Sequence, residues 1–210
     1  MVSEMAKKYW ISMMVISVMA VLGAGLFMVF SAESDDAVYF PLDSGNQWAY
    51  QSIYFDDTSY REDLLVDVQG DGTIRLMVFN NADPVAEIHF QRTKDGLFKT
   101  KEISASKMVN YNPPQLSLAS KLKVGASWKW ESDDKKEKYT SKVLAGGKVK
   151  VPAGTFDTIL IRTEGVIASG EKYTDESWYA KGVGYVKSVI TVGDKKKVDE
   201  LREYTVKKDK

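Results

Sequence analysis

Short runs of β-branched and aromatic residues, broken about every ten residues by Gly, Asp, Asn or Pro, fill the chain from Val38 onward. Such runs predict an all-β domain, because strands that alternate apolar and polar residues bury one face in a common core. Two runs, 158–161 and 186–192, are the most apolar and are predicted to pack in that core. The predicted strands cover residues 48–55, 63–69, 74–80, 86–92, 97–103, 127–132, 138–144, 148–151, 158–166, 173–180, 184–192 and 198–206.

The segments between these runs carry residues that favour turns. The longest segment without strand texture is 107–121, where the proline pair 113–114 is expected to break any ladder. Leu116, Leu118 and Leu122 are expected to form a short helix or to cover an open end of the sheet. Tight hairpins are predicted at Asp71-Gly72, Asp95-Gly96, Gly146-Gly147 and Gly193-Asp194, because glycine readily adopts positive φ.

A long apolar segment at residues 9–30 precedes the β-rich part and contains no charged residue. A helix needs about 20 apolar residues to span the hydrocarbon core of a bilayer, and this segment is long enough. Lys7 and Lys8 precede it and acidic residues follow it, so the positive-inside rule predicts a cytoplasmic N-terminus and an extracytoplasmic body. The sequence therefore predicts a single-pass protein of the inner (cytoplasmic) membrane, with the lipid bilayer as a partner of residues 9–30.

The same segment has a second interpretation as a cleaved signal peptide, which would release the body into the periplasm. Cleavage after Ala32 would place bulky Phe30 where a small residue is preferred, and signal peptides usually have a shorter apolar stretch. Both interpretations give the same division of the chain. It comprises a short N-terminus (1–8), the apolar helix (9–30), a linker (31–37), the β domain (38–206) and a frayed tail (207–210).

Composition excludes several classes of function. The chain has 29 basic and 29 acidic residues, and a body without excess positive charge argues against nucleic acid as a partner. Cysteine is absent, which excludes disulfides, thiolate metal sites and a lipidated cysteine. His89 is the one histidine and is interpreted as structural, so neither a metal site nor a cofactor is predicted. The lysine run 195–197 predicts a solvated loop or a protected strand edge.

A short sequence pattern occurs twice. Leu42, Gly45, Trp48 and Tyr50 match Leu122, Gly125, Trp128 and Trp130 at one fixed spacing. In each copy a glycine turn is followed by two aromatic residues that lie two apart, on one face of a strand. The pattern predicts two similar halves within the β domain, and its alternative is the chance recurrence of a common strand start.

Four motifs together resemble the TapB-like family of exported bacterial proteins. They span residues 39–50, 151–158, 178–188 and 200–204, and include Gly45-Asn46-Gln47-Trp48 and Val151-Pro152-Ala153-Gly154. The resemblance implies a curved antiparallel sheet or half-open barrel, loosely similar to lipoprotein-carrier folds. It implies no enzymatic activity and no catalytic residues. The chain differs from many similar proteins in lacking a lipidated cysteine.

Aromatic residues near strand starts are the candidate site. In a curved sheet they would either line a pocket for an apolar ligand or an envelope component, or fill the core. We therefore expect a non-enzymatic binding protein. The alternatives are an accessory subunit docked on a membrane protein complex, and a hydrolase that uses carboxylates. The candidate residues are Trp48, Tyr50, Trp128, Trp130, Trp178 and Tyr179.

Overall fold

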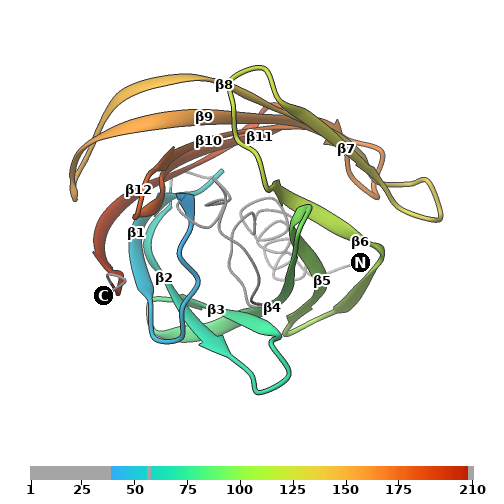
Figure 1. The fold of residues 1–210 in the computed structure, drawn as a ribbon, viewed down its shortest axis with the longest axis horizontal. Helices are drawn as coiled ribbons and strands as arrows, with labels where there is room; N and C mark the ends of the chain where they lie inside the picture. The colour runs from blue at the N-terminus through green and yellow to red at the C-terminus, as the bar shows by residue number, and fades with distance from the viewer. Residues whose placement is uncertain (1–38, 56–57, 208–210) are drawn as a thin grey trace.

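The computed structural model describes residues 39–55 and 58–207. These residues form an all-β fold of twelve antiparallel strands in one sheet, which wraps into a nearly closed barrel (Figure 1). The predicted fold class, a curved antiparallel sheet or half-open barrel, is confirmed. Among the described residues no helix is long and apolar enough to span a membrane. The predicted apolar helix 9–30 and the linker 31–37 lie outside the described residues.

The strands follow one another along the sheet as a meander. They are β1 (Gln47–Ile53), β2 (Ser59–Val68), β3 (Ile74–Asn80), β4 (Asp83–Thr93), β5 (Gly96–Ser104), β6 (Met108–Ala119), β7 (Ser127–Glu131), β8 (Lys138–Val151), β9 (Gly154–Val166), β10 (Lys172–Ala180), β11 (Gly184–Val192) and β12 (Lys195–Thr205). β1 pairs with β12 and joins the two halves, so β6 and β7 are the two ends of the sheet.

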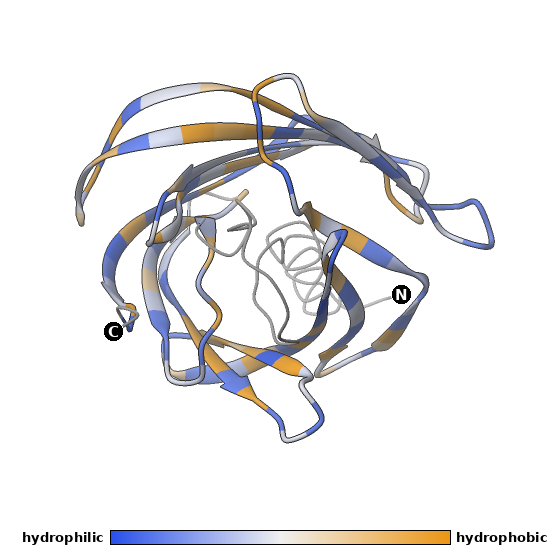
Figure 2. Ribbon diagram, in the orientation of Figure 1, coloured by the Kyte–Doolittle hydropathy of each residue, from blue (hydrophilic) through white to orange (hydrophobic). Residues whose placement is uncertain are grey.

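Alternation along the strands sorts residues between the barrel interior and the solvent (Figure 2). On β2, Leu64 and Val66 face inward and are buried. Arg61 faces the opposite way and is exposed. On β11 every second residue from Val186 to Val192 is buried, as its apolar sequence predicts. The prediction for 158–161 is wrong in part, because Ile161 is buried but the three residues before it are half-buried.

Two segments differ from the prediction. The stretch 107–121 contains β6, an edge strand whose pairing with β5 stops before Tyr111 and resumes at Gln115. Prolines are tolerated on an edge strand because half of its backbone groups need no partner there, so the pair 113–114 interrupts the ladder without ending the strand. The predicted strands 138–144 and 148–151 are one strand, β8, and Gly146-Gly147 is a bulge within it, not a hairpin.

A two-residue hairpin between β3 and β4 was not predicted, because no glycine lies at this turn. Asn81 and Ala82 have φ angles of 48° and 73° and connect the paired residues Asn80 and Asp83. Positive φ at both central positions is the geometry that matches the twist of a two-residue hairpin. Asn81 also accepts a hydrogen bond from the Arg61 backbone N–H through its side chain (3.0 Å), which holds the turn against β2.

The two halves have the same local structure at their starts, as the repeated pattern predicts. Gly45 and Gly125 have φ angles of 88° and 93°. Each donates its N–H to a carbonyl on the next strand, Gly45 to Val66 and Gly125 to Val143, both at 2.8 Å. The strand pairing is equivalent too. In the first half one cross-strand row runs Trp48–Leu64–Val78. In the second half the corresponding row runs Trp128–Ser141–Thr163.

Candidate functional site

Trp48 and Tyr50 on β1 point into the barrel and are almost completely buried. The Trp48 indole donates to the Val183 carbonyl at 2.6 Å and the Tyr50 hydroxyl to the Tyr185 carbonyl at 3.0 Å. Phe40 stacks on Trp48, and a Cβ at Gly184 would meet the Phe40 ring at 2.5 Å, so this contact requires glycine. Buried indole and phenol groups need partners, and here the partners are backbone carbonyls. These two residues are core.

Trp128 and Trp130 on β7 close the seam between the two ends of the sheet. Their indoles donate across it to the carbonyls of Leu116 and Pro113 on β6, each at 3.0 Å, and the Tyr139 hydroxyl also donates to Leu116. Over the described residues β6 and β7 share no ladder. Side-chain donors, together with one backbone hydrogen bond from Asp133 to the Asn112 carbonyl (3.0 Å), therefore hold the seam, whereas ladders of backbone hydrogen bonds join the other neighbouring strands.

The last two candidate aromatics lie on β10. Tyr179 is buried in the core, whereas Trp178 is only partly buried and packs against the core from its edge. Trp178 pairs with Leu160 and Lys187, so it shares their outward-facing row. The six candidate residues therefore do not converge on one pocket.

An ionic cluster inside the barrel was not predicted. Lys197 on β12 is fully buried, with its ammonium 2.9 Å from Asp199 and 3.1 Å from Glu62 on β2. Asp199 also accepts hydrogen bonds from Ser52 (2.6 Å) and Ser188 (2.9 Å). The expectation that the run 195–197 is solvated is thus wrong for Lys197, because β12 is a central strand on which every second residue faces inward. Its alternation with Asp199 and Leu201 was the available signal.

Burial changes the protonation of this region. It raises the pKa of Glu62 to about 7 despite the adjacent Lys197, and the pKa of Asp175 on β10 to about 8. Asp175 accepts a hydrogen bond from Ser177 at 2.8 Å. Burial lowers the pKa of Lys197, but the carboxylates of Asp199 and Glu62 outweigh it and keep the ammonium charged. One ammonium contacts two carboxylates, so we interpret the cluster as an internal ion-pair network, in which the Glu62 Oε1 atom is buried without a hydrogen-bond partner.

His89 lies on β4 beside Glu87, to which its Nε2 is hydrogen-bonded. Arg75 approaches the same Glu87 carboxylate at 3.8 Å, so the histidine belongs to a cross-strand charge network on the outside of β3 and β4. Among residues 39–55 and 58–207, no three His, Asp or Glu side chains are placed to hold a metal ion.

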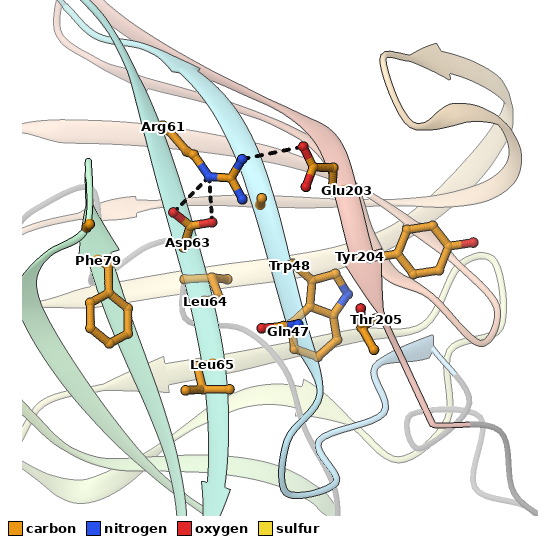
Figure 3. Close-up of a pocket in the computed structure, with 12 residues that line it drawn as sticks. Gln47, Trp48, Arg61, Asp63, Leu64, Leu65, Phe79, Glu203, Tyr204 and Thr205 are labelled. Carbon is orange, nitrogen blue, oxygen red and sulfur yellow. Dashed lines mark hydrogen bonds and ion pairs between the residues drawn. The ribbon is translucent and has the colours of Figure 1, made fainter.

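A groove on the outer face crosses β12, β1, β2 and β3 and encloses about 530 Å³ (Figure 3). Its floor is the cross-strand row Ala49–Asp63–Phe79 with Leu65 beside it. The half-exposed Tyr204 lines the β12 side, with its ring edge-on to Phe156 at 6.2 Å between ring centroids. Small-molecule sites commonly enclose about 300–1,000 Å³, so the groove is large enough for one ligand. Of the six candidate aromatic residues, Trp48 contributes to the lining of this groove. The groove as a whole was not predicted, because its members come from four strands and most of them look like ordinary outward-facing residues.

Arg61 provides the polar end of this groove. Its guanidinium contacts Asp63 at 2.8 Å and Glu203 at 3.4 Å, and these carboxylates raise its pKa, with the Asp63 hydrogen bond the largest cause (Figure 3). Two carboxylates face one cation, so the polar end of the groove carries a net charge of −1. This charge disfavours an anionic ligand, and the guanidinium between the carboxylates leaves a donor for the acceptor of a neutral ligand.

Comparison with protein families and with curated proteins found no match. Two solved structures are similar in part. One is a candidate lipoprotein from Parabacteroides distasonis ATCC 8503, with 13% identity, a TM-score of 0.44, and coverage of 80% of this chain and 98% of the other. The second is a candidate exported protein with a YmcC-like fold from Bacteroides fragilis NCTC 9343, with 13% identity, a TM-score of 0.43, and coverage of 79% and 98%. We base no conclusion on likenesses this weak, and the resemblance to the TapB-like family stays a prediction.

Proposed function

We propose that the chain is a non-enzymatic binding protein that works outside the cytoplasm, held at the membrane by residues 9–30. The groove across β12, β1, β2 and β3 carries this proposal, because it combines ligand-sized volume with an apolar floor and a polar end. The uncharged segment 9–30, with lysines before it and acidic residues after it, supports the location.

The chemistry of the groove narrows the class of ligand. Leu65 and Phe79 offer apolar surface, and the exposed ring of Tyr204 can cover one side of a bound molecule. Arg61 can donate hydrogen bonds from a guanidinium whose positive charge is more than offset by Asp63 and Glu203. The best fit is a neutral molecule with an apolar face and a hydrogen-bond acceptor at one end. This places the ligand on the outer face of the sheet, whereas the sequence led us to expect it inside.

Tyr204→Ala tests the assignment, because this ring lies in the groove and is 41% exposed, so its loss should cost little stability. The full chain is purified from its native membrane in mild non-ionic detergent, and bound small molecules are quantified by mass spectrometry. We expect the wild type to retain a molecule and Tyr204→Ala to retain about tenfold less, the loss of about 1.4 kcal/mol of contact.

Ile53→Ala is the matched control, since Ile53 is 44% exposed on the same strand as Ala49 but does not line the groove. It should retain as much ligand as the wild type. Equal retention by all three proteins would place the ligand elsewhere. A wild type without any bound molecule, or one that turns over envelope glycans, would contradict the binding proposal.

A further inference from the structure

The internal repeat places a second groove on the other half of the barrel. The floor row Ala49–Asp63–Phe79 of the first groove corresponds in strand order and register to the row Lys129–Thr140–Glu164 on β7, β8 and β9. That second row also lines a groove, and its volume of about 540 Å³ is nearly the same. The two grooves therefore occupy equivalent positions in the two halves.

The shared framework carries different chemistry in the second groove. Arg61 corresponds to Lys138. Their ladder partners, Gln51 and Glu131, occupy equivalent positions, each two residues after the row residue of its strand. The apolar Ala49 and Phe79 are replaced by the charged Lys129 and Glu164. Lys172 on β10 adds a third lysine, because it pairs with Val166 from one side as Lys138 does from the other.

These three lysines are not neutralised as Arg61 is. Lys129, Lys138 and Lys172 are exposed, and none has a carboxylate within 4 Å among the described residues. Glu164, which lines the same groove, is bound at 2.8 Å by Arg162 outside it. Adjacent strands lie about 4.8 Å apart, so Lys138 and Lys172, two strands apart, stand roughly 10 Å from each other across Val166. Glu131, the ladder neighbour of Lys138, also lines the groove, so three lysines face two carboxylates and the net charge is +1.

We propose that the groove formed by β7, β8, β9 and β10 is a second binding site, which holds a phosphate-bearing ligand between Lys129, Lys138 and Lys172. Lysine ammonium groups act as mobile point charges that suit the several oxygens of a phosphate, whereas planar carboxylates are matched best by arginine. The long lysine side chains can converge on an anion that enters the open groove, and the Thr140 hydroxyl lies in the same row to donate a further hydrogen bond. This site does not depend on the ligand proposed for the first groove.

Tripolyphosphate is the probe, titrated by calorimetry into the full chain in non-ionic detergent at about 20 mM and about 200 mM salt. We expect one binding event per chain that weakens at the higher salt, because exposed charges are screened. The double variant Lys138→Ala/Lys172→Ala should bind at least about tenfold more weakly, since it removes two of three charged donors. The matched control Lys195→Ala/Lys196→Ala removes two exposed lysines of β12 outside the groove and should bind as the wild type does.

A competition arm distinguishes a free phosphate from a lipid headgroup. If monomeric short-chain phosphatidylglycerol displaces tripolyphosphate, the site accepts a phospholipid headgroup. If it does not, while tripolyphosphate still binds through the lysines, the ligand is a soluble phosphate ester. Absence of tripolyphosphate binding, or equal weakening in the control variant, would overturn the proposal.

Discussion

At the scale of single residues, the barrel keeps ionisable groups where an apolar core would be simpler. Lys197, Glu62 and Asp199 are each at most 2% exposed, and the Lys197 ammonium contacts both carboxylates across β12 and β2. Removing one partner of a buried pair typically costs about 3–5 kcal/mol, because the other charge is left uncompensated. Asp175 is different, since its partner among the described residues is the neutral Ser177 hydroxyl. Its protonation should therefore be linked to folding.

Asp175→Asn should reduce the pH dependence of stability, while the contribution of Glu62, whose pKa burial raises to about 7, remains. Burial raises the pKa of Asp175 to about 8, whereas an unfolded aspartate titrates near 4. Between these values the folded chain holds a proton that the unfolded chain releases, so the free energy of unfolding falls as pH rises from about 4 to 8, by up to about 1.4 kcal/mol per pH unit. Urea titrations at pH 5, 6, 7 and 8 measure this slope. An unchanged slope in the variant would show that Asp175 is not the titrating group, and the exposed Asp157→Asn should leave the slope as it is.

At the scale of elements, the β6–β7 seam is the weak point of the barrel, because side-chain donors replace a ladder there. Trp130→Phe removes the indole donor to the Pro113 carbonyl while keeping an aromatic ring against Tyr139. We expect a loss of about 1–3 kcal/mol in the free energy of unfolding. Hydrogen exchange followed by mass spectrometry should show faster exchange in β6, with β12 unchanged, because opening of the seam leaves the β1–β12 junction intact.

Trp178→Phe is the control for the seam, since Trp178 lies on β10, a central strand paired on both sides. It should leave exchange in β6 as in the wild type. Equal acceleration in every strand of the Trp130→Phe protein would mean that the variant is destabilised as a whole and that the seam is not a separate opening unit.

The elements were predictable to the extent that local sequence determines them. β3 and β11 have the predicted bounds, because both are apolar runs ended by turn residues. β6 was missed because its prolines argue against a ladder, and nothing local shows that the strand lies at an edge. The division of β8 failed for a related reason. Two adjacent glycines suggest a turn, but here they form a bulge in the ladder between β8 and β9. A Cβ atom at Gly146 would lie 2.0 Å from the Thr158 carbonyl oxygen, so the close approach of the two strands requires glycine there.

At the scale of the whole molecule, the repeated Gly–Trp pattern was the most informative feature of the sequence. It predicted two halves, and the pairing registers agree strand by strand from β1 and from β7. The two grooves could not be predicted, because each combines mainly outward-facing residues of four strands, with Trp48 in one and Trp130 in the other, and depends on register. The burial of Lys197 could not be predicted for the same reason, since it depends on β12 lying between β1 and β11 in the sheet.

A crystal structure of the full chain, purified from its native membrane without refolding, tests the central claim most directly. The account predicts electron density for a bound molecule in the groove across β12, β1, β2 and β3, in contact with Phe79 and Tyr204 and with its polar end toward Arg61. A groove that is empty of ligand, while a bound molecule lies elsewhere on the chain or is absent, would contradict it.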